Sequence, residues 1–177
     1  MTNFHPKIFT LPNGIRVVYQ ERSQSMIAHC CLMINAGSRD EKKNEQGLAH
    51  LIEHALFKGT TKRKAFHILS RLDSVGGELN ASTTKEDTSL YASFLSEYFP
   101  RAIELIADIA FHSNFPEKEI EKEKQVIIDE INSYLDNPSE AIFDDFEELL
   151  FQSHSIGRNI LGTTQSVSKM EQKHITS

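Results

Sequence analysis

Residues 47–60 read GLAHLIEHALFKGT, and this stretch is the most informative part of the sequence. Its leucine, isoleucine and alanine side chains recur at the spacing of an amphipathic helix, which we expect over Gln46–Lys58. On such a helix His50 and His54 lie one turn apart on a single face, and Glu53 shares that face with His50. Two neutral imidazoles in this arrangement can bind Zn²⁺ and leave a coordination position open beside the carboxylate. The stretch therefore predicts a helix that carries a metal-binding face.

The pattern H-x-x-E-H within this stretch has a functional interpretation and a chance interpretation. In inverted zinc peptidases the two histidines bind the metal and the glutamate acts as a base. The chain contains 8 histidines, however, and a five-residue pattern of this kind arises by chance in roughly one such chain in thirty. The motif therefore needs support from the rest of the sequence.

The segments around this helix predict an α+β domain, in which helices pack on one face of a mostly antiparallel sheet. The pair Asn13-Gly14 between two alternating runs is a strong hairpin signal. Alternating apolar side chains predict strands on both sides of the helix, and helical spacing predicts further helices. The expected strands are Lys7–Leu11, Ile15–Gln20, Met26–Ala36, Glu78–Thr84 and Asp87–Phe94, and the expected helices are Lys64–Val75, Ser96–His112, Pro116–Leu135 and Pro138–Phe151. The tail after His154 is expected to be looser.

Composition places the chain among globular proteins of one domain. It has 177 residues, of which 39% are hydrophobic and 25% charged, and its formal net charge is −6. This acidic balance argues against nucleic acid as a partner. The first residues lack the apolar run of a signal peptide, and the longest apolar run, Met26–Gly37, is too short and too polar to span a membrane. The adjacent Cys30 and Cys31 are poorly placed to bridge each other, so we expect a reducing, cytoplasmic location and no membrane partner.

Four segments of the chain resemble, in order, the signature motifs of the pitrilysin/insulinase family of zinc metallopeptidases, which includes the mitochondrial processing peptidase β-subunit. The first segment is residues 47–60, and the others are GGELNA at 76–81, EKEKQVIIDEI at 121–131 and HSIGRNILGT at 154–163. The resemblance extends from about Phe9 to Thr164, which is nearly the whole chain. It implies the N-terminal domain of a processing-peptidase-like metallohydrolase, with peptide-bond hydrolysis as the activity.

The resemblance also implies roles for individual residues. It makes His50, His54 and Glu130 the ligands of one Zn²⁺ ion, and Glu53 the base that activates a water molecule. Glu123 lies two helical turns before Glu130 on the same face, and we expect it to orient the metal site from behind the ligands. From composition alone, the carboxylates of this Glu/Lys-rich helix would be taken to face water.

Asn80 and Ala81 fall on the segment that resembles the family's strand beside the active site. The resemblance implies that the edge of this strand pairs with an extended peptide substrate, so that backbone groups bind any sequence and pockets select side chains. The two residues can equally be ordinary sheet residues that follow the Gly76-Gly77 turn. Both interpretations stay open at the level of sequence.

Three functions are compatible with these residues. The first is a zinc-dependent endopeptidase that acts on unfolded or extended peptides. The second is an S-ribosylhomocysteine lyase, a short enzyme with the same motif; its third ligand is a downstream cysteine, whereas Cys30 and Cys31 precede the motif in this chain. The third is a non-catalytic partner or structural subunit of a processing-peptidase-like complex, although such subunits usually have degraded motifs.

Length is the one departure from the family pattern. Relatives have two homologous halves, whereas residues 1–177 correspond to a single N-terminal domain, which we expect to stop before the last strand of the first half. The second half is expected to supply Arg and Tyr groups that bind substrate, and the full-length protein is expected to form a homo- or heterodimer. We therefore expect residues 1–177 alone to be a weak or inactive protease.

Overall fold

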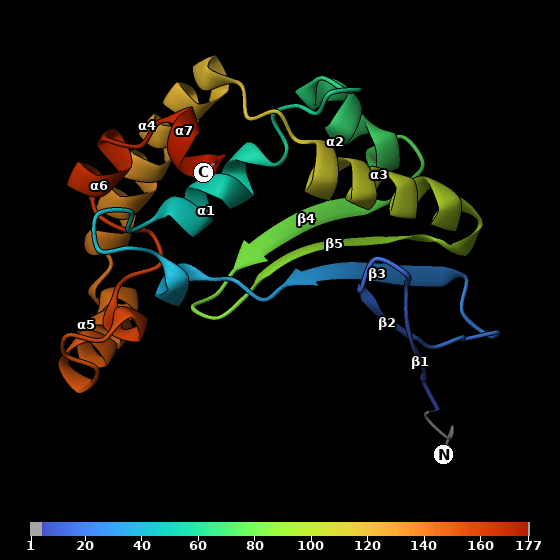
Figure 1. The fold of residues 1–177 in the computed structure, drawn as a ribbon, viewed down its shortest axis with the longest axis horizontal. Coiled ribbons are helices and arrows are strands. Elements are labelled where there is room, and N and C mark those ends of the chain that lie inside the picture. Colours follow the sequence, from blue (N-terminus) through green and yellow to red (C-terminus); the bar gives the residue numbers. More distant parts are fainter. Residues whose placement is uncertain (1–4, 177) are drawn as a thin grey trace.

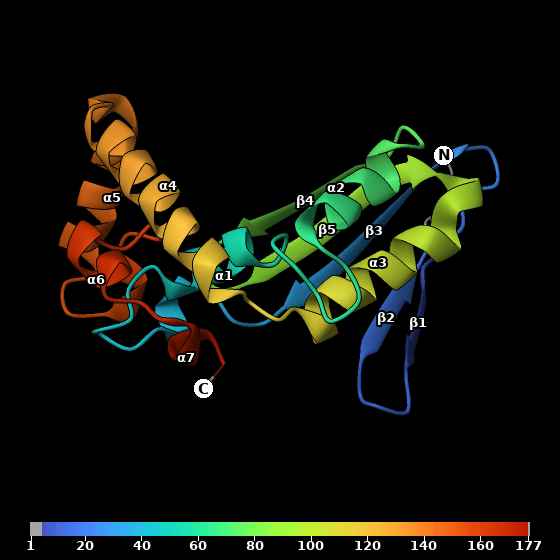
Figure 2. The same cartoon turned by 90° about the horizontal axis from the view of Figure 1, so that it is seen from above.

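The computed structural model describes residues 5–176, which form an arch with two limbs (Figure 1). One limb is a sheet with two helices on one face, α2 (Ala65–Asp73) and α3 (Phe99–His112). The other limb is helical and contains α4 (Glu117–Leu135), α5 (Pro138–Leu150), α6 (Thr164–Ser168) and α7 (Gln172–Ile175). Helix α1 (Leu48–Ala55) lies between the two limbs, as the view from above also shows (Figure 2). Within residues 5–176, no helix combines the length and the apolar character needed to cross a membrane.

The strands of the described residues form two separate antiparallel sheets. β1 (Lys7–Thr10) and β2 (Arg16–Tyr19) pair as a hairpin, and β3 (Ile27–Ile34), β5 (Thr88–Leu95) and β4 (Glu78–Thr83) form a sheet in that order. The predicted α+β class with antiparallel strands is confirmed. The hairpin does not extend the sheet of β3, because its side chains are exposed almost throughout and no buried face fixes its register against β3.

Helix α1 is shorter than the predicted Gln46–Lys58. It begins at Leu48 because Gly47, at the N-cap, has a φ of +89°, a left-handed conformation that glycine adopts without steric cost. It ends at Ala55, and the chain continues through turns towards Thr60. The strong apolar spacing therefore located the helix correctly but not its ends.

The tail after His154 is more ordered than the sequence predicts. It contains α6 and α7, and α6 begins with a capping box in which the side chains of Thr163 and Ser166 satisfy each other's backbone N–H groups. The hydroxyl of Ser166 also donates a hydrogen bond to the carbonyl oxygen of Gln46 at 2.7 Å. This contact attaches the tail to the segment that precedes α1.

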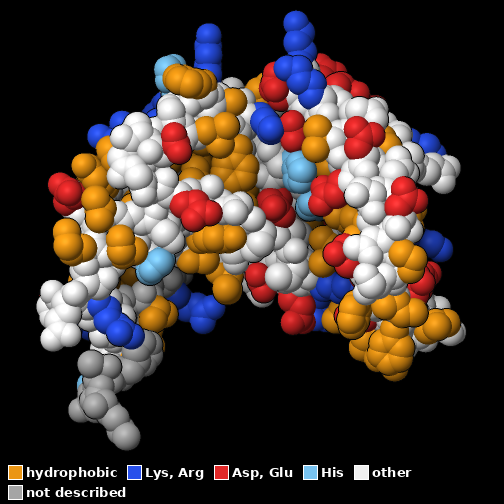
Figure 3. Space-filling model, turned by 180° about the vertical axis from the view of Figure 1, so that it is seen from behind, with side chains coloured by type: hydrophobic (Ala, Val, Ile, Leu, Met, Phe, Trp, Pro, Cys, Tyr) orange, Lys and Arg blue, Asp and Glu red, His pale blue; other side chains and the backbone are white. Residues whose placement is uncertain are grey.

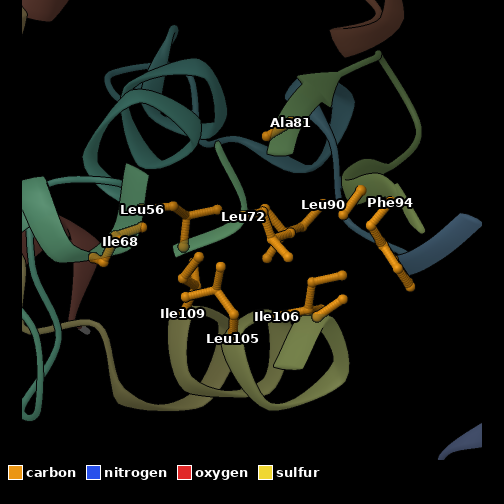
Figure 4. Packing of buried hydrophobic residues seen from close by; sticks show 11 residues of the cluster. Leu56, Ile68, Leu72, Ala81, Leu90, Phe94, Leu105, Ile106 and Ile109 are labelled. Carbon is orange, nitrogen blue, oxygen red and sulfur yellow. The ribbon is translucent and has the colours of Figure 1, made fainter. Parts of the chain in front are cut away.

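The larger buried cluster lies between the three-stranded sheet and helices α2 and α3 (Figure 4). Alternate residues of β5 face the helices, whereas Tyr91 on the other face of the strand is exposed. Burial of each leucine, isoleucine or phenylalanine side chain in this cluster contributes about 1.5–3 kcal/mol to the free energy of unfolding. The labelled members are Leu56, Ile68, Leu72, Ala81, Leu90, Phe94, Leu105, Ile106 and Ile109. Leu56, which directly follows α1, connects that helix to the sheet limb.

A second buried cluster joins α1 to α4 and to the tail. Helix α4 contributes isoleucines that recur on one face at helical spacing. Lys124 is buried beside them, and its ammonium donates hydrogen bonds to Glu121 and to the carbonyl oxygen of Met170. The members of the cluster are Leu51, Ile120, Ile127, Ile131, Val167 and Met170.

Helix α5 forms where the spacing predicts a helix, but its apolar side chains stay exposed. Hydrophobic groups gather at this end of the molecule (Figure 3). The side chains are 58–70% exposed and belong to Ile142, Phe143, Phe146, Leu149 and Leu150. An apolar patch of this kind is unusual on a monomeric soluble protein.

Candidate metal centre

Two contacts fix the start of α1. The carboxylate of Glu41 accepts hydrogen bonds from the backbone N–H groups of Gly47 and Ala49, at 3.0 and 2.8 Å, which satisfies donors at the helix N-terminus. Burial raises the pKa of Glu41 to about 7, against the opposing effect of these donors. On the other side, Gly162 packs its backbone so closely that a Cβ there would lie 2.3 Å from the carbonyl oxygen of Gln46. The start of α1 is thus held between a polar loop and the tail.

Three potential ligand atoms converge where α1 faces α4. Nε2 of His50 lies 3.8 Å from Oε2 of Glu130, and Nε2 of His54 lies 3.7 Å from the same oxygen. The ligand atoms of the three residues all lie within 4.8 Å of one another. The structure therefore brings together the three residues that the sequence predicts as ligands, although they come from two helices that are far apart in the chain.

His50 is held as a neutral ring. Burial lowers its pKa to about 4, and the neighbouring His54 acts in the same direction. The two rings meet edge to face, with centroids 4.6 Å apart. Because metals bind the neutral imidazole, this environment favours the ligating form. Nδ1 of His50 is buried and has no hydrogen-bond partner within residues 5–176.

His54, in contrast, has a partner on the far side of its ring. Its Nδ1 lies 3.1 Å from Oε2 of Glu123, and the other oxygen of that carboxylate lies 2.8 Å from Nζ of Lys58. An ionised carboxylate only accepts hydrogen bonds, so Nδ1 carries the proton and Nε2 keeps its lone pair. The structure thus places Glu123 behind a ligand, where an orienting residue has to lie.

Glu53 shares the α1 face that carries the histidines. Its side chain is half-buried, and it makes no hydrogen bond or ion pair with any other residue in the range 5–176. Its negative charge acts on His50, whose pKa it raises against the larger effect of burial. A carboxylate next to the ligands and without a partner is available to exchange a proton with a bound molecule.

Asn80 and Ala81 lie on β4, the edge strand that packs against α1. Within the described residues β4 pairs with β5 on one side only, so its other edge is open. The N–H of Ala81 donates to Oδ1 of the preceding Asn80 at 2.9 Å, while the methyl group of Ala81 is buried in the larger cluster.

The donor set and its spacing fit a zinc ion. Two imidazole nitrogens and one carboxylate oxygen form a ligand set of catalytic zinc sites, which keep a fourth position open. Ligand atoms bound to tetrahedral zinc at about 2.0–2.1 Å lie about 3.3 Å apart. The separations of 3.7 and 3.8 Å to Oε2 of Glu130 are close to this value. The side chain of Glu130 is 45% exposed, so this side of the centre is open to solvent.

The sequence that forms this centre matches a known protein family. The family described as Insulinase (Peptidase family M16) matches residues 16–164, which is most of the chain. The chain belongs to the insulinase family. The resemblance predicted from the ordered motifs is confirmed, and hydrolase and metalloprotease chemistry is the chemistry of this family.

Two relatives show how much of an insulinase-family protein the chain represents. The chain is 40% identical over 172 residues to a protein from Mycobacterium tuberculosis named uncharacterized zinc protease. The aligned region covers 97% of this chain and 39% of that protein. The chain is 37% identical over 171 residues to the mitochondrial-processing peptidase subunit beta of Bos taurus, covering 96% of this chain and 34% of the relative. The chain therefore spans less than half the length of the relatives it matches.

Solved structures share the fold of this insulinase-family domain. A protease from Helicobacter pylori superposes with a TM-score of 0.92 at 26% identity, covering 98% of this chain and 42% of that one. A Pseudomonas fluorescens domain described as an inactive peptidase domain superposes with a TM-score of 0.89 at 17% identity, with coverages of 97% and 42%. The second likeness concerns the fold alone.

Sequence reasoning missed two residues of this centre, Lys58 and Glu41. Lys58 lies four residues after His54, a helical spacing that could have indicated a shared partner on α4. Glu41 lies in a polar loop upstream of the helix, and no local pattern marks it as the residue that satisfies the start of α1.

Proposed function

We propose that this domain carries the catalytic centre of a zinc-dependent endopeptidase, with His50, His54 and Glu130 as ligands of one Zn²⁺ ion. The observation that carries the proposal is the convergence of three ligand atoms beside an unpaired glutamate of the same helix. The family supports it, because relatives over nearly the whole chain are named zinc proteases. When bound, zinc supplies Lewis-acid chemistry that activates a water molecule and polarises the scissile carbonyl.

The residues of the chain perform the proton transfers. Glu53 accepts a proton from the attacking water and later delivers it to the leaving amine, as a general base and then a general acid. His54 keeps its proton-free Nε2 directed towards the ligand oxygen of Glu130, because Glu123 holds the proton of His54 on Nδ1. Because the activated water attacks the carbonyl directly in this scheme, no covalent intermediate is needed.

The open edge of β4 is the proposed binding place for substrate. An extended peptide can add to such an edge through main-chain hydrogen bonds, which bind many sequences. Because the N–H of Ala81 is held by Oδ1 of Asn80, the Asn80 side chain must turn away before a peptide can use that donor. This requirement gives Asn80 a part in substrate binding. Addition to a strand edge favours unfolded or extended peptides as substrates.

A non-catalytic role as a partner subunit is the second candidate. It is motivated by the solved neighbour that is described as an inactive domain. The full set of His50, Glu53, His54 and Glu130 in this chain favours the catalytic alternative. The chain spans only about two fifths of the length of its relatives. We therefore also propose that the longer protein has a second homologous half and forms a dimer.

Elemental analysis and a peptidase assay on the Glu53→Gln variant test the proposed function. The variant should bind one zinc per chain, as the wild type does, because Glu53 is a base and not a ligand. In the longer two-half protein it should lose cleavage of an unstructured peptide, whereas residues 1–177 alone should cleave weakly or not at all. Glu148→Gln, on the exposed surface of α5, is the matched control and should change neither property. If Glu53→Gln lost zinc, or kept full cleavage in the longer protein, the assigned role would be wrong.

A further inference from the structure

Lys58 follows α1 and is held in place from both sides. Leu56 is buried in the larger cluster, and Thr60 is buried and bonded through its N–H to the carbonyl oxygen of Arg63 at 2.8 Å. The N–H of Lys58 itself donates to the carbonyl oxygen of Ala55 at 3.1 Å, which continues the helical turn. The backbone at Lys58 is therefore fixed relative to α1 and its histidines.

The side chain of Lys58 reaches across to α4. Its Nζ lies 2.8 Å from Oε1 of Glu123, whose side chain is only 10% exposed. The other oxygen of the same carboxylate lies 3.1 Å from Nδ1 of His54. With each oxygen held by a different donor, the carboxylate plane cannot rotate without breaking one of the two contacts. The ammonium thus fixes the orientation of the group that orients the histidine.

The two histidines differ in this respect. Nδ1 of His50 has no hydrogen-bond partner within residues 5–176, so the packing around the ring alone holds it. His54 is held by hydrogen bonding, and its side chain is 22% exposed against 9% for His50. A more exposed ring depends more on a directed contact to keep one orientation. Removal of the Lys58 ammonium should therefore change the orientation of the His54 ring.

We propose that Lys58 is a positioning residue of the metal centre: through Glu123 it fixes the ring orientation and the tautomer of His54. The inference rests on the proposed function, because it gives Lys58 a purpose at the metal site. The inference goes beyond the proposed function because it adds Lys58 to the contact between Glu123 and His54. The resulting array, Lys58–Glu123–His54, connects the segment after α1 to α4 and then to the ligand on α1. Lys58 touches neither the ligand atoms nor the place where a substrate would react.

Zinc affinity, measured by competition with a chromophoric chelator, is the first test. Lys58→Met preserves length and removes the charge, and should weaken zinc binding by about 10–100-fold, the usual effect of removing an outer partner of a metal ligand. Lys58→Arg keeps a donor and a charge and should stay within about threefold of the wild type. Lys118→Met removes an ammonium from an exposed position of α4 and should have no effect.

The nitrogen chemical shifts of His54 in the metal-free protein are the second test. Wild type and Lys58→Arg should show a proton fixed on Nδ1, and Lys58→Met should show a mixture of tautomers. A Lys58→Met protein with wild-type zinc affinity and wild-type His54 shifts would overturn the inference, as would a Lys58→Arg protein as weak as Lys58→Met. If the wild type bound no zinc, the proposed function would fail, while the tautomer measurement would still decide the role of Lys58.

Discussion

The larger buried cluster joins the sheet to α2 and α3, whereas the smaller one joins α1 to α4 and the tail. The buried members of the first come mainly from the sheet, α2 and α3, which carry none of the potential metal ligands, and Leu56 and Ile52 connect α1 to them. The second includes side chains of both ligand-bearing helices: Leu51 lies between the two ligand histidines in the sequence of α1, and Ile127 lies between Glu123 and Glu130 in that of α4. Both clusters therefore contribute to stability, whereas the metal geometry depends on the second.

Helix α4 shows how the second cluster does this. Residues 123, 127 and 130 share one face, since they are separated by four and three positions. Ile127 is fully buried against the cluster, while the carboxylates of Glu123 and Glu130 reach the histidines on either side of it. The apolar packing between α1 and α4 in this cluster therefore sets the register of both carboxylates.

Removal of a ligand should have the largest effect. Glu130→Gln and His54→Ala should each abolish stoichiometric zinc binding, because two remaining ligands do not form a closed site. Elemental analysis after gel filtration measures the loss. Both variants should keep the wild-type circular dichroism spectrum, since neither residue belongs to a buried cluster. Retention of one zinc per chain by Glu130→Gln would mean that another carboxylate is the third ligand.

A pair of cavity-forming substitutions should separate the two clusters. Leu105→Ala and Ile127→Ala each remove a fully buried side chain and should lower the free energy of unfolding by about 2–5 kcal/mol. Only Ile127→Ala should also weaken zinc binding, by about tenfold, because it loosens the register between Glu123 and Glu130. Denaturant unfolding and chelator competition on the same samples measure both effects. Equal zinc affinities for the two variants would remove the distinction between the clusters.

Acidification of the metal-free protein should remove a contribution of His50 to the stability of α1. The pKa of His50 is about 4 in the folded chain and 6.5 when unperturbed, so the unfolded state binds the extra proton between these values. The stability that neutral His50 confers is therefore present above pH 6.5 and is lost as the pH falls towards 4. Glu41 at the start of α1 opposes this loss, because its raised pKa of about 7 adds stability as the pH falls from 7 towards 4.5. Hydrogen exchange should therefore show α1 and α4 better protected in acid in His50→Gln than in the wild type; an unchanged profile would assign the acid response to other groups.

The sequence predicted the elements of both limbs better than their connections. The alternation of Leu90, Ala92 and Phe94 predicted a strand with one buried face, and that face is buried. The hairpin of β1 and β2, which the Asn13-Gly14 pair predicted, is confirmed, but its separation from the sheet of β3 was not predicted, because a hairpin signal does not say whether the pair joins a larger sheet. The order in the tail was missed as well, since it depends on contacts such as Ser166 with Gln46, which are distant in the chain.

The metal centre was predicted by two kinds of reasoning. Helical spacing alone placed His50, Glu53 and His54 on one face, and the structure has that helix. Glu130 and Glu123 came from family resemblance, because a carboxylate in a Glu/Lys-rich helix has no local mark that separates a ligand from a solvent-facing residue. The resemblance did not indicate Lys58, whose position depends on how the chain turns after α1.

The smallest effect is expected at Glu119, one turn before Glu123 on α4. Glu119 forms an exposed ion pair with Lys122 at 2.7 Å, and such pairs within one helix contribute about 0.2–0.5 kcal/mol. Glu119→Gln should therefore change the free energy of unfolding by less than about 0.5 kcal/mol and leave zinc affinity unchanged. Glu123→Gln, the same chemical change one turn later, should weaken zinc binding by about 10–100-fold. Chelator competition on the two variants gives a direct comparison, because helix, charge and side-chain length are matched. If zinc affinity were unchanged in both variants, the contact between Glu123 and His54 would contribute as little to metal binding as the ion pair of Glu119 does. The second cluster would then hold α1 and α4 together without orienting a ligand.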